Sequence, residues 1–314
     1  MSLGGQELTK PRLGIALGSG GARGWVHVGV LQALKQQGIE PDVVCGCSMG
    51  ALVGGAYVSG ELDSLEAWAL TITRMDMLRY LDVNIFNGGV IDGKSIMSML
   101  QNFKEDALIE SLEKPFIAVA SDLLTGREIW LQEGSLSEAV RASISIPGIF
   151  SPQKTGGKWL LDGGLTNPVP VSACRALGAE IIIAVNPTAD ALGFRYRSHE
   201  SPEEISPNEP RSALLDRLFD TVPDSIKSGV KAMTPDFLSS DIDRIGYFDV
   251  LSSSIDIMTD QIMRSRLAGE PPHIMLQPKL GQFSTLDFHR AEEAITEGRN
   301  IVQDALPALQ KLIK

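Results

Sequence analysis

The first 60 residues alternate between short apolar runs and segments of helical periodicity, and this alternation constrains the fold more than any other feature. Residues 13–17 and 42–46 are runs of strand length with glycine at or just after their ends. Residues 24–37 carry apolar side chains at helical spacing, and residues 51–60 are rich in small side chains. Strand, helix, strand, helix in this order is typical of a parallel α/β layer.

The same alternation continues along the chain. Apolar runs of strand length predict further strands at residues 115–120, 128–131, 159–161 and 180–186. Helical periodicity predicts helices at residues 62–75, 94–103, 136–142, 169–177 and about 286–313. We therefore predict an α/β fold of three layers (α/β/α), in which helices cover both faces of a mostly parallel central sheet.

The composition changes after residue 187, where proline and glutamate become frequent. We expect a long exposed loop at about residues 190–210. The predicted organisation is a core over residues 12–187, with a loop-and-helix part over residues 188–314 packed on the same domain.

Charge excludes one class of partner. The 28 Lys and Arg against 39 Asp and Glu give a net charge of −11, so no nucleic-acid partner is expected.

The three cysteines are too few for a disulfide framework, which favours a reducing, cytoplasmic location. The N-terminus lacks the apolar core of a signal peptide. The uncharged stretch at residues 43–60 is interrupted by glycines and predicts a strand, a turn and a helix instead of a membrane span.

The first candidate motif is Gly46-Cys-Ser-Met-Gly50, which lies between a predicted strand and a predicted helix. In this context the sequence G-x-S-x-G is typical of a nucleophile elbow, a tight turn that lifts a serine hydroxyl out of the sheet edge. The flanking Gly46 and Gly50 leave room for the backbone of such a turn. The motif therefore makes Ser48 a candidate nucleophile, although the same spacing also occurs in ordinary tight turns.

The second motif is the glycine loop, Gly18-Ser-Gly-Gly-Ala-Arg-Gly24, again between a strand and a helix. It is not a dinucleotide fingerprint, because Arg23 stands where the third glycine is required, and no Gly-Lys-Ser/Thr follows as in a P-loop. Free amides at a helix start suit a tetrahedral oxyanion or a phosphate. A glycine-rich turn without chemistry is the alternative interpretation.

The third motif is Asp162-Gly163-Gly164, at the end of a predicted strand. Taken alone, such a tripeptide indicates a turn. Together the three motifs place a nucleophile, amide donors and a base at strand ends, where α/β sheets bind ligands. This set predicts acyl transfer through a serine ester.

The ordered motifs resemble the patatin-like phospholipase family, in its bacterial branch. The resemblance covers about residues 12–187 and includes the segments Gly18–Gly24, Gly46–Gly50, Arg141–Pro147 with Phe150 and Pro152, and Asp162–Pro170. It implies a Ser–Asp dyad without histidine, in which Ser48 is the nucleophile and Asp162 the general base. It also implies an oxyanion hole formed by the amides of Gly20, Gly21 and Ala22.

The resemblance further implies a serine acyl hydrolase of esterase or phospholipase A type, which acts on lipid or other ester substrates without metal or organic cofactor. A transient contact with a membrane surface is expected. Supporting roles fall to Arg23, Gly46, Gly50, Gly163 and Gly164. Arg23 either holds the glycine loop by bonding carbonyl groups or meets a lipid phosphate, and we favour the first role.

Other interpretations remain open at this point. A Ser–Asp–His hydrolase would use His273 or His289, whereas His27 precedes the elbow and His199 falls in the predicted loop. A non-catalytic lipid- or protein-binding module on the same fold is a second alternative, and nucleotide binding at the glycine loop is a third. Apolar stripes at residues 214–222 and 248–262 predict helices packed on the core, or a lid. Head group, acyl length and oligomeric state are left open.

Two of the cysteines, Cys45 and Cys47, form a C-x-C pair. No second Cys/His cluster accompanies it, so we expect small buried residues and no metal site.

Overall fold

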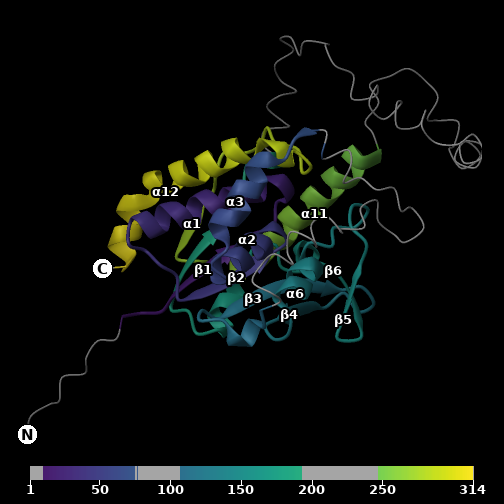
Figure 1. Cartoon of the computed structure of the whole chain (residues 1–314), viewed down its shortest axis with the longest axis horizontal. Coiled ribbons are helices and arrows are strands. Elements are labelled where there is room, and N and C mark those ends of the chain that lie inside the picture. Colours follow the sequence, from purple (N-terminus) through teal and green to yellow (C-terminus); the bar gives the residue numbers. More distant parts are fainter. Residues whose placement is uncertain (1–9, 75, 77–106, 193–246, 314) are drawn as a thin grey trace, which may run out of the picture. The chain divides into compact units, whose positions relative to one another are not determined.

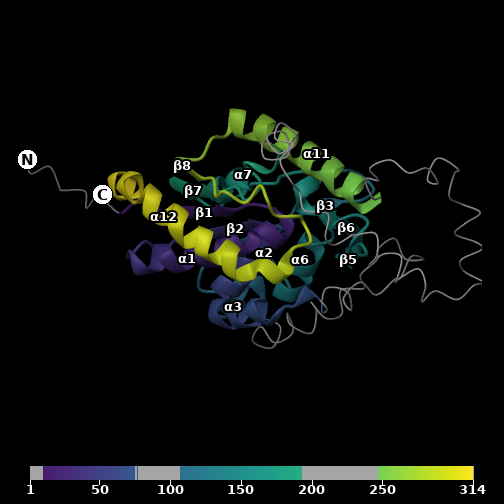
Figure 2. The same cartoon turned by 90° about the horizontal axis from the view of Figure 1, so that it is seen from above.

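The computed structural model describes residues 10–74, 76, 107–192 and 247–313. In this part of the chain one sheet of eight strands has the order β5-β6-β3-β2-β1-β7-β8, with β4 paired to β3 (Figure 1 and Figure 2). The strands are β1 (Leu13–Leu17), β2 (Val43–Cys47), β3 (Phe116–Asp122), β4 (Glu128–Leu131), β5 (Gln153–Thr155), β6 (Lys158–Asp162), β7 (Ile181–Val185) and β8 (Ile274–Leu276). The pairs among β3, β2, β1, β7 and β8 are parallel, and the pairs that involve β4, β5 and β6 are antiparallel.

Helices cover both faces of this sheet. The described helices are α1 (Val26–Gln36), α2 (Met49–Val58), α3 (Leu62–Thr71), α6 (Leu136–Ser143), α7 (Val171–Ala176), α11 (Tyr247–Gly269) and α12 (Ala291–Ile313). Short 3-10 turns precede α1 and α12, at Gly21–Trp25 and Phe288–Arg290, and another follows β6 at Gly163–Leu165. Seen from above, α1, α2 and α3 lie on one side of the strands and α7 and α11 on the other (Figure 2).

The alternation of side chains along the strands produces two cores, one on each face. Leu17 and Val44 point into the larger core, which also takes side chains from α1, α2, α3 and α12. Their strand neighbours Ala16 and Cys45 point into the other core, beneath α7. Strands that are buried on both faces read as continuous apolar runs, which is the pattern seen in the sequence. The expected three-layer α/β/α fold is confirmed.

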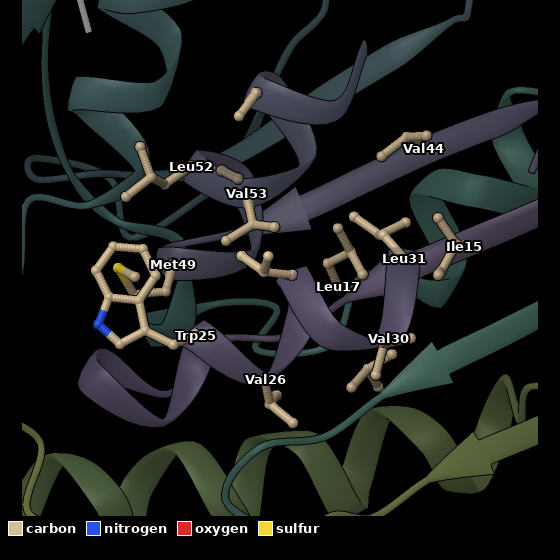
Figure 3. Close-up of a cluster of buried hydrophobic side chains, with 14 of the residues drawn as sticks. Ile15, Leu17, Trp25, Val26, Val30, Leu31, Val44, Met49, Leu52 and Val53 are labelled. Carbon is tan, nitrogen blue, oxygen red and sulfur yellow. The ribbon is translucent and has the colours of Figure 1, made fainter. Parts of the chain in front are cut away.

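The larger core joins the first two helices to the sheet. Figure 3 shows Leu31 of α1 beside Ile15 and Leu17 of β1, and the indole ring of Trp25 beside Met49 at the start of α2. These side chains are buried, so α1 and α2 are fixed against the strands that precede them. Each of these helices begins close to a turn that leaves the sheet, and the two turns are the elbow and the glycine loop.

The C-terminal part contributes to the same architecture. The described residues from Leu251 onward belong to the same compact unit as the strands and helices that precede residue 193. Helix α12 packs closely against α1 at Gly29 and Gly298. A Cβ atom on either glycine would overlap the backbone of the other helix. Strand β8 adds to the sheet edge at β7. The boundary at residue 187 stays a prediction.

Most predicted elements are confirmed, with shifts at their ends. Strands β5 and β8 were not predicted, and each has only three residues. Helix α12 begins at Ala291 after a 3-10 turn, five residues later than expected. The predicted helix at residues 94–103, most of the loop at 190–210 and the stripe at 214–222 lie outside the described residues. In the described ranges no helix has both the length and the apolar content needed to cross a bilayer.

Candidate active site

The sheet itself brings the first and third motifs of the sequence, the elbow at Ser48 and Asp162, together. Strand β3 pairs with β2 through residues 116–119, with β4 through residues 118–121 and with β6 through residues 120–122. Because β4 overlaps both other partners, it occupies one edge of β3, and β2 and β6 share the opposite edge end to end. The end of β2 and the end of β6 therefore meet in the middle of β3.

The register places two side chains at that meeting point. Cys47, the last residue of β2, lies opposite Val119, and Asp162, the last residue of β6, lies opposite the next residue, Ala120. Ser48 follows Cys47 directly. Strand β6 pairs with β3 in the antiparallel direction and ends where β2 ends. For this reason Ser48 and Asp162, which are 114 positions apart in the sequence, are in contact.

Ser48 has the backbone of a nucleophile elbow. Its φ of 56° and ψ of −124° are rare for a residue with a side chain, and in the described part of the chain it is the one non-glycine residue with positive φ. Gly46 and Gly50 permit this turn, because a Cβ on Gly50 would overlap the carbonyl oxygens of Leu17 and Gly18. The strained turn begins α2 immediately after β2, as the motif predicts.

The hydroxyl of Ser48 donates a hydrogen bond of 2.5 Å to Oδ2 of Asp162. The other carboxylate oxygen, Oδ1, accepts the amide hydrogen of Gly164 at 2.7 Å. Ser48 and Asp162 are 1% and 5% exposed, so the pair lies in a site that water hardly reaches. Burial raises the pKa of Asp162 to about 6, against the opposite effect of the bonds from Ser48 and Gly164.

Ser143, at the end of α6, is hydrogen-bonded to the elbow. Its hydroxyl accepts the backbone N–H of Ser48 at 2.9 Å and donates to the carbonyl of Val119 at 2.5 Å. Two residues later, the carbonyl of Ser145 accepts the amide of Asp162 at 2.9 Å. Neither serine has a role predicted from the sequence, although both lie in the segment Arg141–Pro147 that carries part of the family resemblance. The segment thus fixes both members of the Ser–Asp pair.

The glycine loop is fixed at both ends by backbone hydrogen bonds. Gly18 donates to Val185 at the end of β7, and Ser19 donates to Pro168. The amide of Ala22, expected in the oxyanion hole, donates instead to the carbonyl of Thr285 at 2.9 Å, so it is not free for a substrate oxygen. Gly20 and Gly21 remain as candidate donors, since neither amide donates to a carbonyl in the described part of the chain.

Arg23 lies inside the protein, with 1% of its surface exposed. Its guanidinium donates to the carbonyl of Phe283 at 2.6 Å and lies 3.7 Å from Oδ2 of Asp256 on α11. These contacts support the structural role over contact with a lipid phosphate. Of the remaining supporting residues, Gly163 makes room for close packing, because a Cβ there would overlap the carbonyl of Val119.

The histidines of the described ranges make bonds elsewhere. His273 accepts the amide of Ile182 through Nδ1, and His289 accepts from Arg74. His27 is buried behind the glycine loop, where its ring N–H donates to the carbonyl of Gly18, and burial lowers its pKa to about 4. None of the three is hydrogen-bonded to Ser48 or Asp162, and His199 lies outside the described residues. The arrangement thus favours the dyad over the Ser–Asp–His alternative.

The cysteines beside the elbow are buried, and burial raises the pKa of the Cys45 and Cys47 thiols. A buried thiol with a raised pKa is a poor nucleophile and a poor metal ligand. Cys45 and Cys47 therefore act as small packing residues on β2, as expected.

Comparison with known proteins identifies the family. The family model described as "Patatin-like phospholipase" matches residues 15–175, about half of the chain. The chain belongs to the patatin-like phospholipase family. The match includes the glycine loop, the elbow and Asp162, but it ends before Asp256, Phe283 and Thr285.

Relatives of this family member include "Uncharacterized NTE family protein Mb1092c" of Mycobacterium bovis, which is 33% identical over 96% of this chain and 93% of its own length. "Patatin-like phospholipase domain-containing protein 7" of Mus musculus is 33% identical over 57% of this chain and 14% of its own length. Among solved structures, VipD from Legionella pneumophila aligns with a TM-score of 0.45 and 14% identity, over 95% of this chain and 67% of the other.

Proposed function

We propose that this protein is a serine acyl hydrolase that cleaves carboxylic esters of lipids through an acyl-enzyme, with Ser48 as nucleophile and Asp162 as general base. The observation that carries the proposal is the 2.5 Å hydrogen bond between these two side chains at a strained strand–helix turn. Membership of the patatin-like phospholipase family supports lipid esters as the substrate class.

In the first half of the reaction, Oγ of Ser48 attacks the ester carbonyl carbon while its proton moves to Oδ2 of Asp162. The tetrahedral intermediate then collapses, the bond to the leaving alcohol breaks, and the alcohol takes the proton from Asp162. The products are a free alcohol and an ester between the acyl group and Ser48. The same carboxylate accepts and returns one proton, so no second base is needed.

In the second half, Asp162 takes a proton from a water molecule that attacks the acyl-enzyme. The new tetrahedral intermediate releases the carboxylic acid, and Oγ of Ser48 recovers its proton from Asp162. Both half-reactions use the same carboxylate, which is why its position beside Oγ of Ser48 matters for the whole cycle.

An aspartate is an ordinary weak base in water, with a pKa near 3.9. Burial changes this, because a carboxylate with a pKa of about 6 takes up the serine proton more readily. The hydrogen bond from Gly164 keeps the carboxylate oriented toward Ser48. In the part of the chain that the structure describes, no histidine is bonded to the pair, and the exclusion of water from the pair compensates for this.

The negative charge that develops on the ester oxygen requires donors. We assign this role to the amides of Gly20 and Gly21, and we leave out Ala22 because Thr285 already accepts its amide hydrogen. In other enzymes a single donor of this kind contributes about 3–4 kcal/mol to lowering the barrier.

The proposal is tested by turnover on short esters, lysophospholipids and diacyl phospholipids, with Ser48→Ala as the matched inactive variant. We expect ester hydrolysis by the wild-type protein, and a loss of about 10⁴-fold or more in a Ser48→Ala protein that still folds. Equal rates for the two proteins, or no hydrolysis of any ester, would contradict the proposal. The second result would favour the non-catalytic binding module.

A further inference from the structure

The glycine loop is held mainly by residues far away in the sequence. Arg23 donates to the carbonyl of Phe283, and Ala22 donates to the carbonyl of Thr285. Thr285 also fills the space beside Gly21, where a Cβ would come within 2.5 Å of its carbonyl oxygen and of its methyl carbon. Each of these contacts spans more than 250 positions of the chain.

The next residues continue the same interface. The indole N–H of Trp25 donates to the carbonyl of Phe288 at 3.2 Å, and the two rings meet edge to face at 6.3 Å. Residues 283–288, which we name the clamp segment, therefore contact the chain along residues 21–25. This stretch leads directly from the candidate oxyanion donors into α1.

A charged group on α11 completes the arrangement. Asp256 is 8% exposed, and its Oδ2 lies 3.7 Å from Nη2 of Arg23. The same nitrogen of Arg23 donates to Phe283. The guanidinium therefore joins the glycine loop, α11 and the clamp segment at one point. Removal of one partner of such a buried ion pair leaves an uncompensated charge.

We propose that Asp256 and the clamp segment are positioning elements for the oxyanion donors, so that the region beyond residue 175 sets the rate of ester cleavage without touching substrate. This inference rests on the proposed function. Ala22 and Arg23, the residues after Gly20 and Gly21, are anchored from outside the loop. A shift of about 1 Å in such donors costs up to about 100-fold in rate.

The test compares Asp256→Asn with Asp260→Asn. Asp260 lies one turn further along α11 and is 7% exposed, and it pairs with Arg264 instead of the glycine loop. We expect Asp256→Asn to lower kcat for a short ester by about tenfold to 100-fold at nearly constant KM. Asp260→Asn should stay within about twofold of the wild type, and Asp256→Glu, which keeps the charge, should recover part of the rate.

Two further measurements separate positioning from folding. Replacement of a buried ion pair by apolar residues often leaves stability unchanged, so the double variant R23M/D256L is expected to fold and still to have low kcat. Labelling of Ser48 by a fluorophosphonate, which also needs the oxyanion donors, should slow in parallel with kcat.

The outcomes distinguish this inference from the proposed function. If the wild-type protein hydrolyses the ester and Asp256→Asn matches Asp260→Asn in kcat, the positioning role is wrong and the hydrolase stands. Wild-type kcat in a folded R23M/D256L protein would overturn it as well. If the wild-type protein neither hydrolyses esters nor reacts with the phosphonate, the proposed function itself fails.

Discussion

The elbow at Ser48 and the glycine loop at residues 18–24 are both strand–turn–helix junctions, but different parts of the chain hold them. The elbow is fixed by Ser143 and Asp162, which belong to elements that pair or pack within the central sheet. The glycine loop is bonded to Pro168 and Val185 where it begins. Where it leads into α1, it is fixed by Asp256, Phe283 and Thr285. The nucleophile and base thus lie within the family match, while the donors depend on residues outside it.

The difference has a physical origin. A strained turn such as Ser48 persists only where its surroundings determine it fully, and a buried sheet does this through register and close packing. The glycine loop leaves the sheet and has few side chains of its own, so its conformation depends on what packs over it. The elbow is therefore kept rigid by the sheet around it, whereas the glycine loop is kept rigid by its contacts with the C-terminal region.

The largest expected difference between the two regions concerns glycine substitution. In Gly50→Ala the new methyl group would overlap backbone carbonyls of Leu17 and Gly18, which cannot move without disturbing β1. We expect a loss of about 3 kcal/mol or more in the free energy of unfolding. In Gly20→Ala the methyl group meets the Pro187 side chain at 2.8 Å, outside the sheet, and the loss should be about 1–2 kcal/mol.

Chemical denaturation of both variants measures these losses. An equal or larger loss in Gly20→Ala would mean that the glycine loop is at least as rigid as the elbow, and the comparison would fail.

The second prediction concerns the pH dependence of stability. Burial raises the pKa of Asp162 from 3.8 to about 6, so between these values the folded protein binds a proton that the unfolded chain has lost. The contribution of this group to stability therefore falls as pH rises through that window, by on the order of 3 kcal/mol in total. Asp162→Asn lacks this titration.

The free energy of unfolding of Asp162→Asn minus that of the wild type should accordingly increase between pH 4 and pH 7. Denaturation series at several pH values measure this difference. A constant or decreasing difference would show that the carboxylate is not held in a dry site.

A third prediction concerns the hydroxyl behind the elbow. Ser143→Ala leaves the buried N–H of Ser48 and the carbonyl of Val119 without their partner, at a cost of about 2–3 kcal/mol. The turn should also loosen, and kcat should fall by about tenfold to 100-fold. Ser145→Ala is the matched control, because that hydroxyl is equally buried but bonds to Arg141. If both variants lose the same activity, the contact to Ser48 has no special role.

The smallest expected effect lies at the far end of the glycine loop. Trp25→Phe keeps an aromatic ring beside Phe288, but it removes the indole bond to the Phe288 carbonyl and leaves a small cavity in the core. Together these should cost about 1–2 kcal/mol. Trp130→Phe removes a comparable bond to Glu128 at an exposed site and should cost less than about 0.5 kcal/mol. Thermal unfolding of the two variants measures both losses of stability. A larger loss of stability in Trp130→Phe would weaken the case for the clamp segment.

Local patterns in the sequence predicted most of the fold and the two side chains of the candidate dyad. Apolar runs gave six of the eight strands, because strands buried on both faces have a strong signature. The three-residue strands β5 and β8 were missed, since so short a run has no periodicity of its own. Gly46, Gly50 and Gly164 marked the turns that carry Ser48 and Asp162.

The contacts that hold the site could not be predicted from sequence patterns. Ser143 lies in an ordinary helix end, and its bond to Ser48 depends on the way α6 packs over β3. Ala22 was expected to bind a substrate oxygen, but Thr285, 263 positions later, takes its amide. Asp256 had no motif around it. Such contacts arise from tertiary packing of distant segments, which no local pattern encodes.

The pairing of Ser48 with Asp162 is the central claim, and single-turnover cleavage of a short ester by Asp162→Asn tests it most directly. Asparagine keeps the size of the side chain but cannot accept the serine proton. We expect acylation of Ser48 to slow by about 10³-fold or more in a protein that folds normally. Acylation at close to the wild-type rate would show that another group activates the serine, and the account would be wrong.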